Sequence, residues 1–163
     1  MFKILPSETI IFHSPLSAEI CLQNLANKTE EKKSFKLAWK APVYSKPYIG
    51  FIADGEFEIQ RNITYRNSFL PIIRGKISSQ NDGATITIKM GIESFVKVFM
   101  TIWLSFTFLF CILVLFVAFK ASFSPFFFIP FIMVIFGLML SRGAFKYESK
   151  QSIEDLKNIF EVK

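Results

Sequence analysis

The sequence predicts an α+β fold, in which an antiparallel β-meander with flanking helices is joined to an α-helical transmembrane hairpin. Two patterns indicate this fold. Apolar and polar residues alternate over much of the first part of the chain, and two long apolar stretches follow. We therefore divide the 163 residues into an α+β domain over 1–94, a transmembrane hairpin over 95–141 and an amphipathic helix over 142–163.

The domain is expected to begin with a short strand over residues 9–13, followed by a helix of about three turns. Ser17 is a typical N-cap residue, and the helix is expected to end near Asn27. The charged run over residues 29–33 is expected to be a solvated stop after this helix.

Two glycine-containing turns indicate β-hairpins. Asp54-Gly55 is typical of a type I′ turn and predicts that Ile52 pairs with Phe57. A second turn is expected at residues 81–83. Alternation and turn residues together predict strands over residues 35–40, 48–53, 56–61, 63–66, 69–77 and 85–90.

Two uncharged apolar stretches, residues 98–119 and 122–141, predict the transmembrane hairpin. About 20 apolar residues in a helix span a hydrocarbon core of about 30 Å. A small domain cannot cover two such helices on every face, which argues against a soluble helix pair. Pro125 suits the first turn of the second helix, and Pro130 is expected to bend it. A re-entrant second segment is the alternative.

The C-terminal segment is expected to be an amphipathic helix that packs on the sheet. Ser152 followed by Asp155 is typical of a capping box, so this segment is alternatively two helices. The competing interpretation is that this segment lies on the membrane surface. In both interpretations the buried side of the segment is one apolar stripe: Phe145, Ile153, Leu156, Ile159 and Phe160.

Flanking charges predict the orientation of the hairpin. The turn between the two spans carries only Lys120, and five basic residues flank the outer ends: Lys89, Lys97, Arg142, Lys146 and Lys150. Basic residues favour the cytosolic side, so both termini are expected in the cytoplasm. Cys21 lies in the expected soluble domain and Cys111 in the first span, so the two are not expected to pair. The absence of an expected disulfide agrees with a cytosolic location for the domain.

Residues with catalytic or metal-binding chemistry are sparse in the sequence. His13 is the one histidine, and a structural or solvent-facing role fits it better than that of a catalytic base. One histidine and two distant cysteines do not make a zinc site. We therefore expect no enzymatic activity, no metal and no cofactor, and the formal net charge of +6 is too mild to predict a nucleic-acid partner.

Two groups of residues are candidate contact sites. Four cations could meet anionic lipid or another anionic ligand, or alternatively form a charged outer face that prevents aggregation of the sheet: Arg61, Arg66, Arg74 and Lys76. Small residues in the two spans are candidates for a helix–helix contact: Thr101, Ser105, Gly137 and Ser141.

Three segments carry a resemblance to a known group of proteins: His13–Ser17 (HSPLS), residues 51–61 (FIADGEFEIQR) and residues 65–75 (YRNSFLPIIRG). With the two spans after the sheet and the short C-terminal helix, they resemble bacterial two-span membrane proteins that have a small β-rich cytosolic domain. The resemblance covers most of the chain and implies this architecture and a location in a bacterial inner membrane, but no activity and no catalytic residues.

The function that these features favour is that of an integral membrane protein holding a small cytosolic binding or regulatory module at the bilayer. Its partners would be the lipid bilayer and either another protein or further copies of the chain. The alternative is an oligomeric pore-forming or membrane-perturbing effector gated by its cytosolic domain. A membrane-bound enzyme ranks last, because no acid, base and nucleophile occur together.

Overall fold

The computed structural model describes residues 5–32, 43–118 and 124–162, so the strand expected over 35–40 lies outside the described residues. Within the described residues the fold is α+β. Its elements are β1 (Ser7–Ser14), α1 (Ala18–Lys28), β2 (Thr29–Glu31), β3 (Tyr48–Ala53), β4 (Glu56–Arg61), β5 (Ile72–Gln80), β6 (Gly83–Gly91), α2 (Ser94–Ala118), the 3₁₀ turn η1 (Pro125–Phe128) and α3 (Ile129–Ile159).

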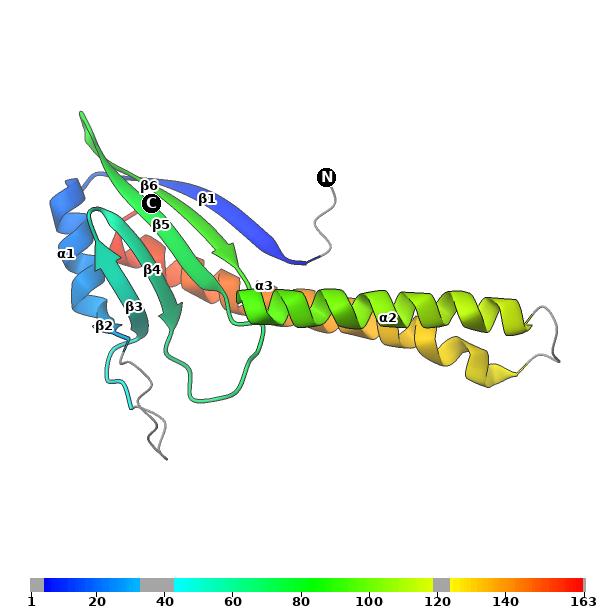
Figure 1. Ribbon diagram of the computed structural model, residues 1–163. Helices are drawn as coiled ribbons and strands as arrows, with labels where there is room; N and C mark the ends of the chain where they lie inside the picture. Colours follow the sequence, from blue (N-terminus) through cyan, green and yellow to red (C-terminus); the bar gives the residue numbers. More distant parts are fainter. Residues whose placement is uncertain (1–4, 33–42, 119–123, 163) are drawn as a thin grey trace.

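The described strands form one sheet of six, in the order β1-β6-β5-β4-β3-β2. β3 to β6 are the predicted antiparallel meander, and β1 pairs antiparallel with β6 (Figure 1). The expectation for residues 29–31 was wrong, because this segment is β2 and runs parallel to β3. Thr29 follows α1, and its hydroxyl donates to Leu25 O at 2.8 Å. Thr29 is buried, and residues 29–31 lie beside β3.

The predicted turn at Asp54-Gly55 is confirmed. Both residues have positive φ, 50° and 76°, and Ile52 pairs with Phe57 in the predicted register. The expected strand over residues 63–66 is wrong, since residues 62–71 connect β4 to β5 without a strand. Side chains satisfy backbone groups there instead. The Asn62 amide donates to the carbonyl oxygens of residues 44 and 46, and Asn67 Oδ1 accepts from a backbone N–H at 2.9 Å.

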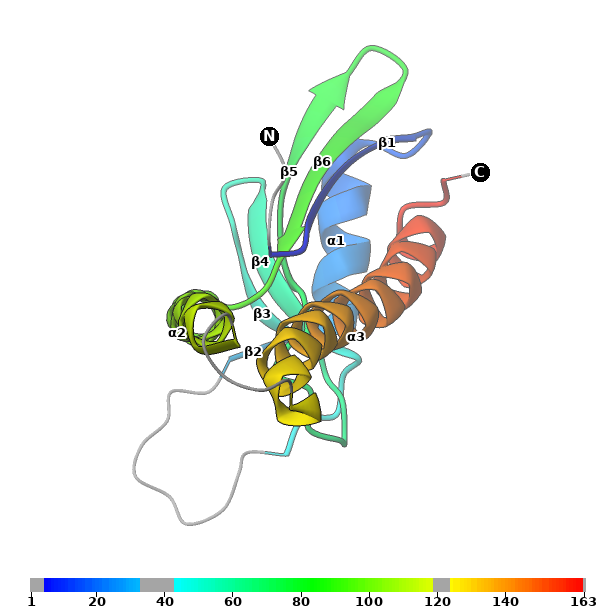
Figure 2. The same cartoon turned by 90° about the vertical axis from the view of Figure 1, so that its right-hand side faces the viewer.

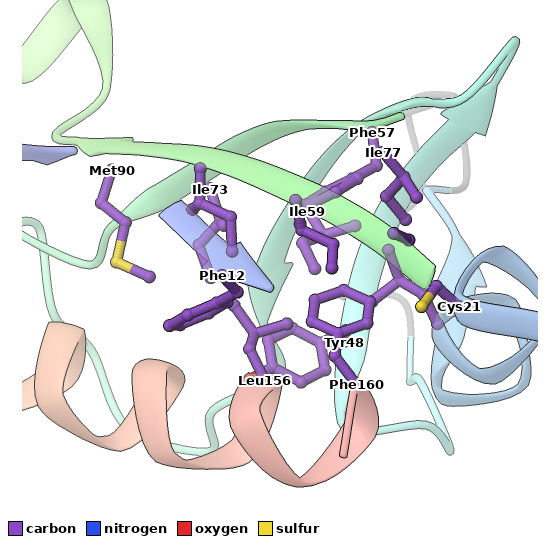
Figure 3. Packing of buried hydrophobic residues seen from close by; sticks show 14 of the residues in the cluster. Phe12, Cys21, Tyr48, Phe57, Ile59, Ile73, Ile77, Met90, Leu156 and Phe160 are labelled. Carbon is purple, nitrogen blue, oxygen red and sulfur yellow. The ribbon is translucent and has the colours of Figure 1, made fainter. Parts of the chain in front are cut away.

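The hydrophobic core lies on one face of the sheet, beneath α1 and the C-terminal half of α3. Figure 3 shows strand residues such as Ile59 and Ile73 packed against Leu156 and Phe160 near the end of the chain. Ser17 caps α1 as predicted, its Oγ accepting from Ile20 N at 3.4 Å. Each large apolar side chain buried here contributes about 1.5–3 kcal/mol to folding, so the last turns of α3 are an integral part of the domain.

The two long helices α2 and α3 pack together and project from the sheet as a hairpin (Figure 1). Figure 2 looks along this hairpin and shows α1 and α3 on the same side of the sheet. Both helices are long and apolar enough to cross a membrane, with mean hydropathies of 2.5 and 2.0, and most of their apolar side chains are exposed.

Helix α3 differs from the expected second span in two respects. Pro130 lies in its first turn, after the 3₁₀ turn η1, so it does not bend the middle of the helix. The chain then stays helical through residue 159, and Ser152 does not cap a new helix. Its hydroxyl instead donates to Glu148 O at 2.9 Å, within α3. One continuous helix therefore belongs both to the hairpin and to the sheet domain.

Candidate functional site

A buried carboxylate joins α3 to the segment between β4 and β5. Glu148 on α3 has no exposed side-chain surface, and its Oε2 accepts from Arg61 Nη1 at 2.9 Å. Its Oε1 accepts from the Tyr65 hydroxyl and from Asn67 Nδ2, the latter at 3.4 Å. Both carboxylate oxygens are thus occupied by donors from one short stretch of sequence.

These donors explain why a charge is tolerated in the interior. Burying a carboxylate costs several kcal/mol unless it is paired and its lone pairs are hydrogen-bonded. Arg61 ends β4 on the same face as the buried Phe57 and Ile59, and this register directs its guanidinium towards α3. The pair therefore fixes the rotation of α3 relative to the sheet.

The network extends beyond Glu148 along α3. Arg61 also donates to Gln151 Oε1 at 2.5 Å and lies 3.7 Å from Asp155 Oδ2. The buried Tyr48 donates to the same Asp155 oxygen at 3.4 Å. Burial, and secondly the negative charge of Asp155, raise the pKa of Tyr48 well above its ordinary value. The hydrogen bond to Glu148, and secondly burial, raise the pKa of Tyr65.

Three further hydrogen bonds attach α3 to the first elements of the chain. The Ser14 hydroxyl donates to Phe160 O at 2.6 Å, and Asn24 Nδ2 donates to Ile159 O at 3.2 Å. The Ser149 hydroxyl donates to Glu8 Oε2 at 2.6 Å. Together with the Glu148 network, these bonds hold the C-terminal half of α3 against the sheet along its length.

The structure does not bring the four candidate cations together. Arg61 lies on the core face with Glu148, whereas Arg74 and Lys76 lie on the opposite face of the sheet. There Arg74 pairs with Glu58 at 2.6 Å and Lys76 with Glu56 at 3.1 Å. Arg66 is exposed on the segment between β4 and β5.

The four candidate helix-contact residues also divide into two pairs. Gly137 and Ser141 are buried on α3, and a Cβ added at Gly137 would lie 2.5 Å from the Trp103 ring of α2. Thr101 and Ser105 are exposed, and each hydroxyl donates to the carbonyl four residues earlier at 2.8 Å. The close approach of the two helices therefore depends on glycine and tryptophan.

Titratable side chains of the described residues form salt bridges and hydrogen bonds rather than a cluster of metal ligands. In the described part of the chain, no three His, Cys, Asp or Glu side chains are grouped in a way that could hold a metal ion. His13 is exposed on the open face of the sheet, where its Nδ1 lies 3.3 Å from the Thr85 hydroxyl. The chemistry available at Glu148 is ion pairing and hydrogen bonding between two parts of the fold.

Sequence reasoning missed Glu148, although one local signal was present. Glu148 lies three residues after Phe145 and eight before Leu156, so helical spacing places it on their buried face. Comparisons with protein-family models, curated proteins and solved structures give no match for the chain.

Proposed function

We propose that this protein is an integral protein of a bacterial inner membrane that holds its sheet domain at the cytosolic surface as a non-enzymatic binding or regulatory module. The observation that carries the proposal is the continuity of α3. Its first half packs on α2 in the apolar hairpin, and its second half is buried under the sheet.

The surface of the hairpin supports insertion into a bilayer. Large apolar side chains on α2 and α3 are exposed on several faces; for example, Phe106 is 69% exposed and Phe136 64%. An apolar patch this large is rare on a soluble monomer, whereas lipid tails would cover it without cost. The hydroxyls of Thr101 and Ser105 already donate within their own helix, so they are also compatible with lipid.

The face of the sheet opposite the core is the surface that we assign to a binding partner. None of the described helices covers it, and it carries two exposed apolar residues, Ile11 and Phe51, among paired charges. The attachment of α3 to the other face presents this surface at a fixed angle to the hairpin. A partner bound there would be held at the membrane in one orientation.

Two experiments test the proposed function. The protein should stay in the membrane pellet after alkaline carbonate washing, and recovery in the supernatant would refute the anchoring role. A photo-crosslinking residue at Thr87, on the open face of β6, should give a discrete adduct in cells. The same residue at the exposed Gln23 of α1 is the control, and equal crosslinking at both positions would contradict the assignment of the open face.

The alternative function is that of an oligomeric pore. A pore needs a polar stripe along the span, and the exposed hydroxyls of Thr101 and Ser105 extend over little more than one turn of α2. Ion or dye release from vesicles containing the purified protein would favour the pore, and intact vesicles favour the anchored module.

A further inference from the structure

A groove of about 850 Å³ runs between α2, α3 and the segment that leads into β1, at the end of the hairpin nearest the sheet. Residues 5–7 form one wall. The rest of the lining includes Lys97, Thr101, Leu104 and Phe108 from α2, with Val134 and Leu138 from α3.

The polarity of the groove changes along its length. Lys97 stands at the end next to the sheet, Thr101 follows one turn later, and Leu104 and Phe108 continue towards the tip of the hairpin. From Lys97 to Phe108 a helix rises about 16 Å, which is close to half of a hydrocarbon core of about 30 Å. The groove is therefore about one leaflet long, with a charged end and an apolar end.

A second cation lies at the depth of Lys97. Gly137 packs on Trp103 and the two helices run antiparallel, so Arg142, five residues after Gly137, is level with Lys97, six residues before Trp103. Lys97 is half-buried and Arg142 is exposed. Neither forms a salt bridge with another described residue. Glu93, four residues before Lys97 in the chain, forms no salt bridge with it, and Glu148, six residues after Arg142, is paired with Arg61. Glu8, next to the wall formed by residues 5–7, accepts from the Ser149 hydroxyl. Both cations are therefore available to an anion.

We propose that this groove binds an anionic phospholipid of the cytosolic leaflet. One acyl chain lies on Leu104, Phe108 and Val134, and the phosphate lies between Lys97 and Arg142. This inference rests on the proposed function, because it requires the hairpin to be in a bilayer. A groove on the other side of α2, lined by Phe106, Phe110 and Met133, is almost wholly apolar and lacks a cation. It should not distinguish headgroups.

The test is lipid retention measured by native mass spectrometry. The full-length protein is purified in a mild detergent with equal amounts of phosphatidylglycerol and phosphatidylcholine of matched chain length. The native chain should retain the anionic lipid preferentially. Retention should fall about fivefold for Lys97→Gln and again for Arg142→Gln, as expected for cations near an anionic surface. Lys89→Gln, on the open face of the sheet, is the charge-matched control and should leave retention unchanged.

A steric pair of variants tests the acyl-chain position. Ser105→Trp fills this groove and should reduce retention, whereas Ile102→Trp projects into the groove on the other side of α2 and should not. Equal retention of the two lipids by the native chain, or an equal effect of Lys89→Gln and Lys97→Gln, would overturn the proposal. Carbonate fractionation of the cell membranes from which each variant is purified keeps the two proposals separate, since release from that membrane pellet refutes membrane anchoring whichever lipid the purified protein retains.

Discussion

Arg61 at the end of β4 and Glu148 in the middle of α3 are 87 positions apart in the chain, and their side chains meet at 2.9 Å. The contact lies where α3 passes from the hairpin to the sheet. A displacement or rotation of the hairpin would have to break it or carry the sheet along. The pair is therefore the buried polar contact at the junction between the two halves of the protein, next to the packing and hydrogen bonds that hold the rest of α3.

Removal of the buried carboxylate should strongly destabilise this link. Glu148→Ala leaves Arg61, Tyr65 and Asn67 without their acceptor, and loss of one partner of a buried ion pair costs about 3–5 kcal/mol. The matched control is Glu58→Ala, which breaks the exposed pair with Arg74 and should cost about 0–1 kcal/mol. Denaturant unfolding in detergent measures both, and equal losses would show that Glu148 has no special role.

A double-mutant cycle isolates the pair itself. Arg61→Gln and Glu148→Gln should each destabilise the domain, and the double variant should lose less than the sum by about 0.5–3 kcal/mol. Strict additivity would mean that the two side chains do not interact in the folded protein. The free energy of unfolding of all four proteins is the quantity to compare.

The close approach of the two long helices predicts opposite effects at two glycines of α3. Alanine at Gly137 would place a Cβ 2.5 Å from the Trp103 ring and should cost about 1–3 kcal/mol through overpacking. At Gly143 no atom lies within 4 Å of an added Cβ, so alanine should be neutral or stabilise the helix by up to about 1 kcal/mol. Thermal unfolding of the two variants in detergent tests this prediction, and a more stable Gly137→Ala would contradict the observed packing.

From the burial of the Tyr48 phenol we expect the free energy of unfolding to depend on pH in alkaline solution. Burial raises the pKa of the phenol, so above pH of about 10 the unfolded chain loses this proton while the folded chain keeps it. Deprotonation then favours unfolding, and stability should fall as the pH rises from about 10 towards the folded pKa. Tyr48→Phe should lose less stability than the native chain over the same interval. Identical pH profiles would mean that the phenol is not buried as observed.

Local sequence patterns account for most of the strands and for the two long helices. The Asp54-Gly55 turn sets the register of β3 and β4, because two residues with positive φ close a hairpin in only a few ways. Such signals act between neighbours in the chain. The alternation that predicted a strand over residues 85–90 agrees with the structure, where Ile86, Ile88 and Met90 are buried on one face of β6.

Features that depend on distant parts of the chain were not predictable in the same way. Thr29 to Glu31 form a strand only because β3 lies beside them. The four cations were grouped as one candidate contact site or charged outer face, yet strand alternation places Arg61 on the core face and Arg74 on the open face. Helical spacing could have placed Glu148 on a buried face, but nothing local identifies Arg61 as its partner.

The most direct test of the account is the sidedness of two cysteines in intact cells. In a chain with Cys21 and Cys111 replaced by alanine, Ser124→Cys lies at the tip of the hairpin and Asn158→Cys at the exposed end of α3. A membrane-impermeant maleimide that reaches the periplasm should label position 124 in intact cells and position 158 only after lysis. The reverse pattern would invert the topology, and labelling of both positions only after lysis would contradict a hairpin that crosses the membrane.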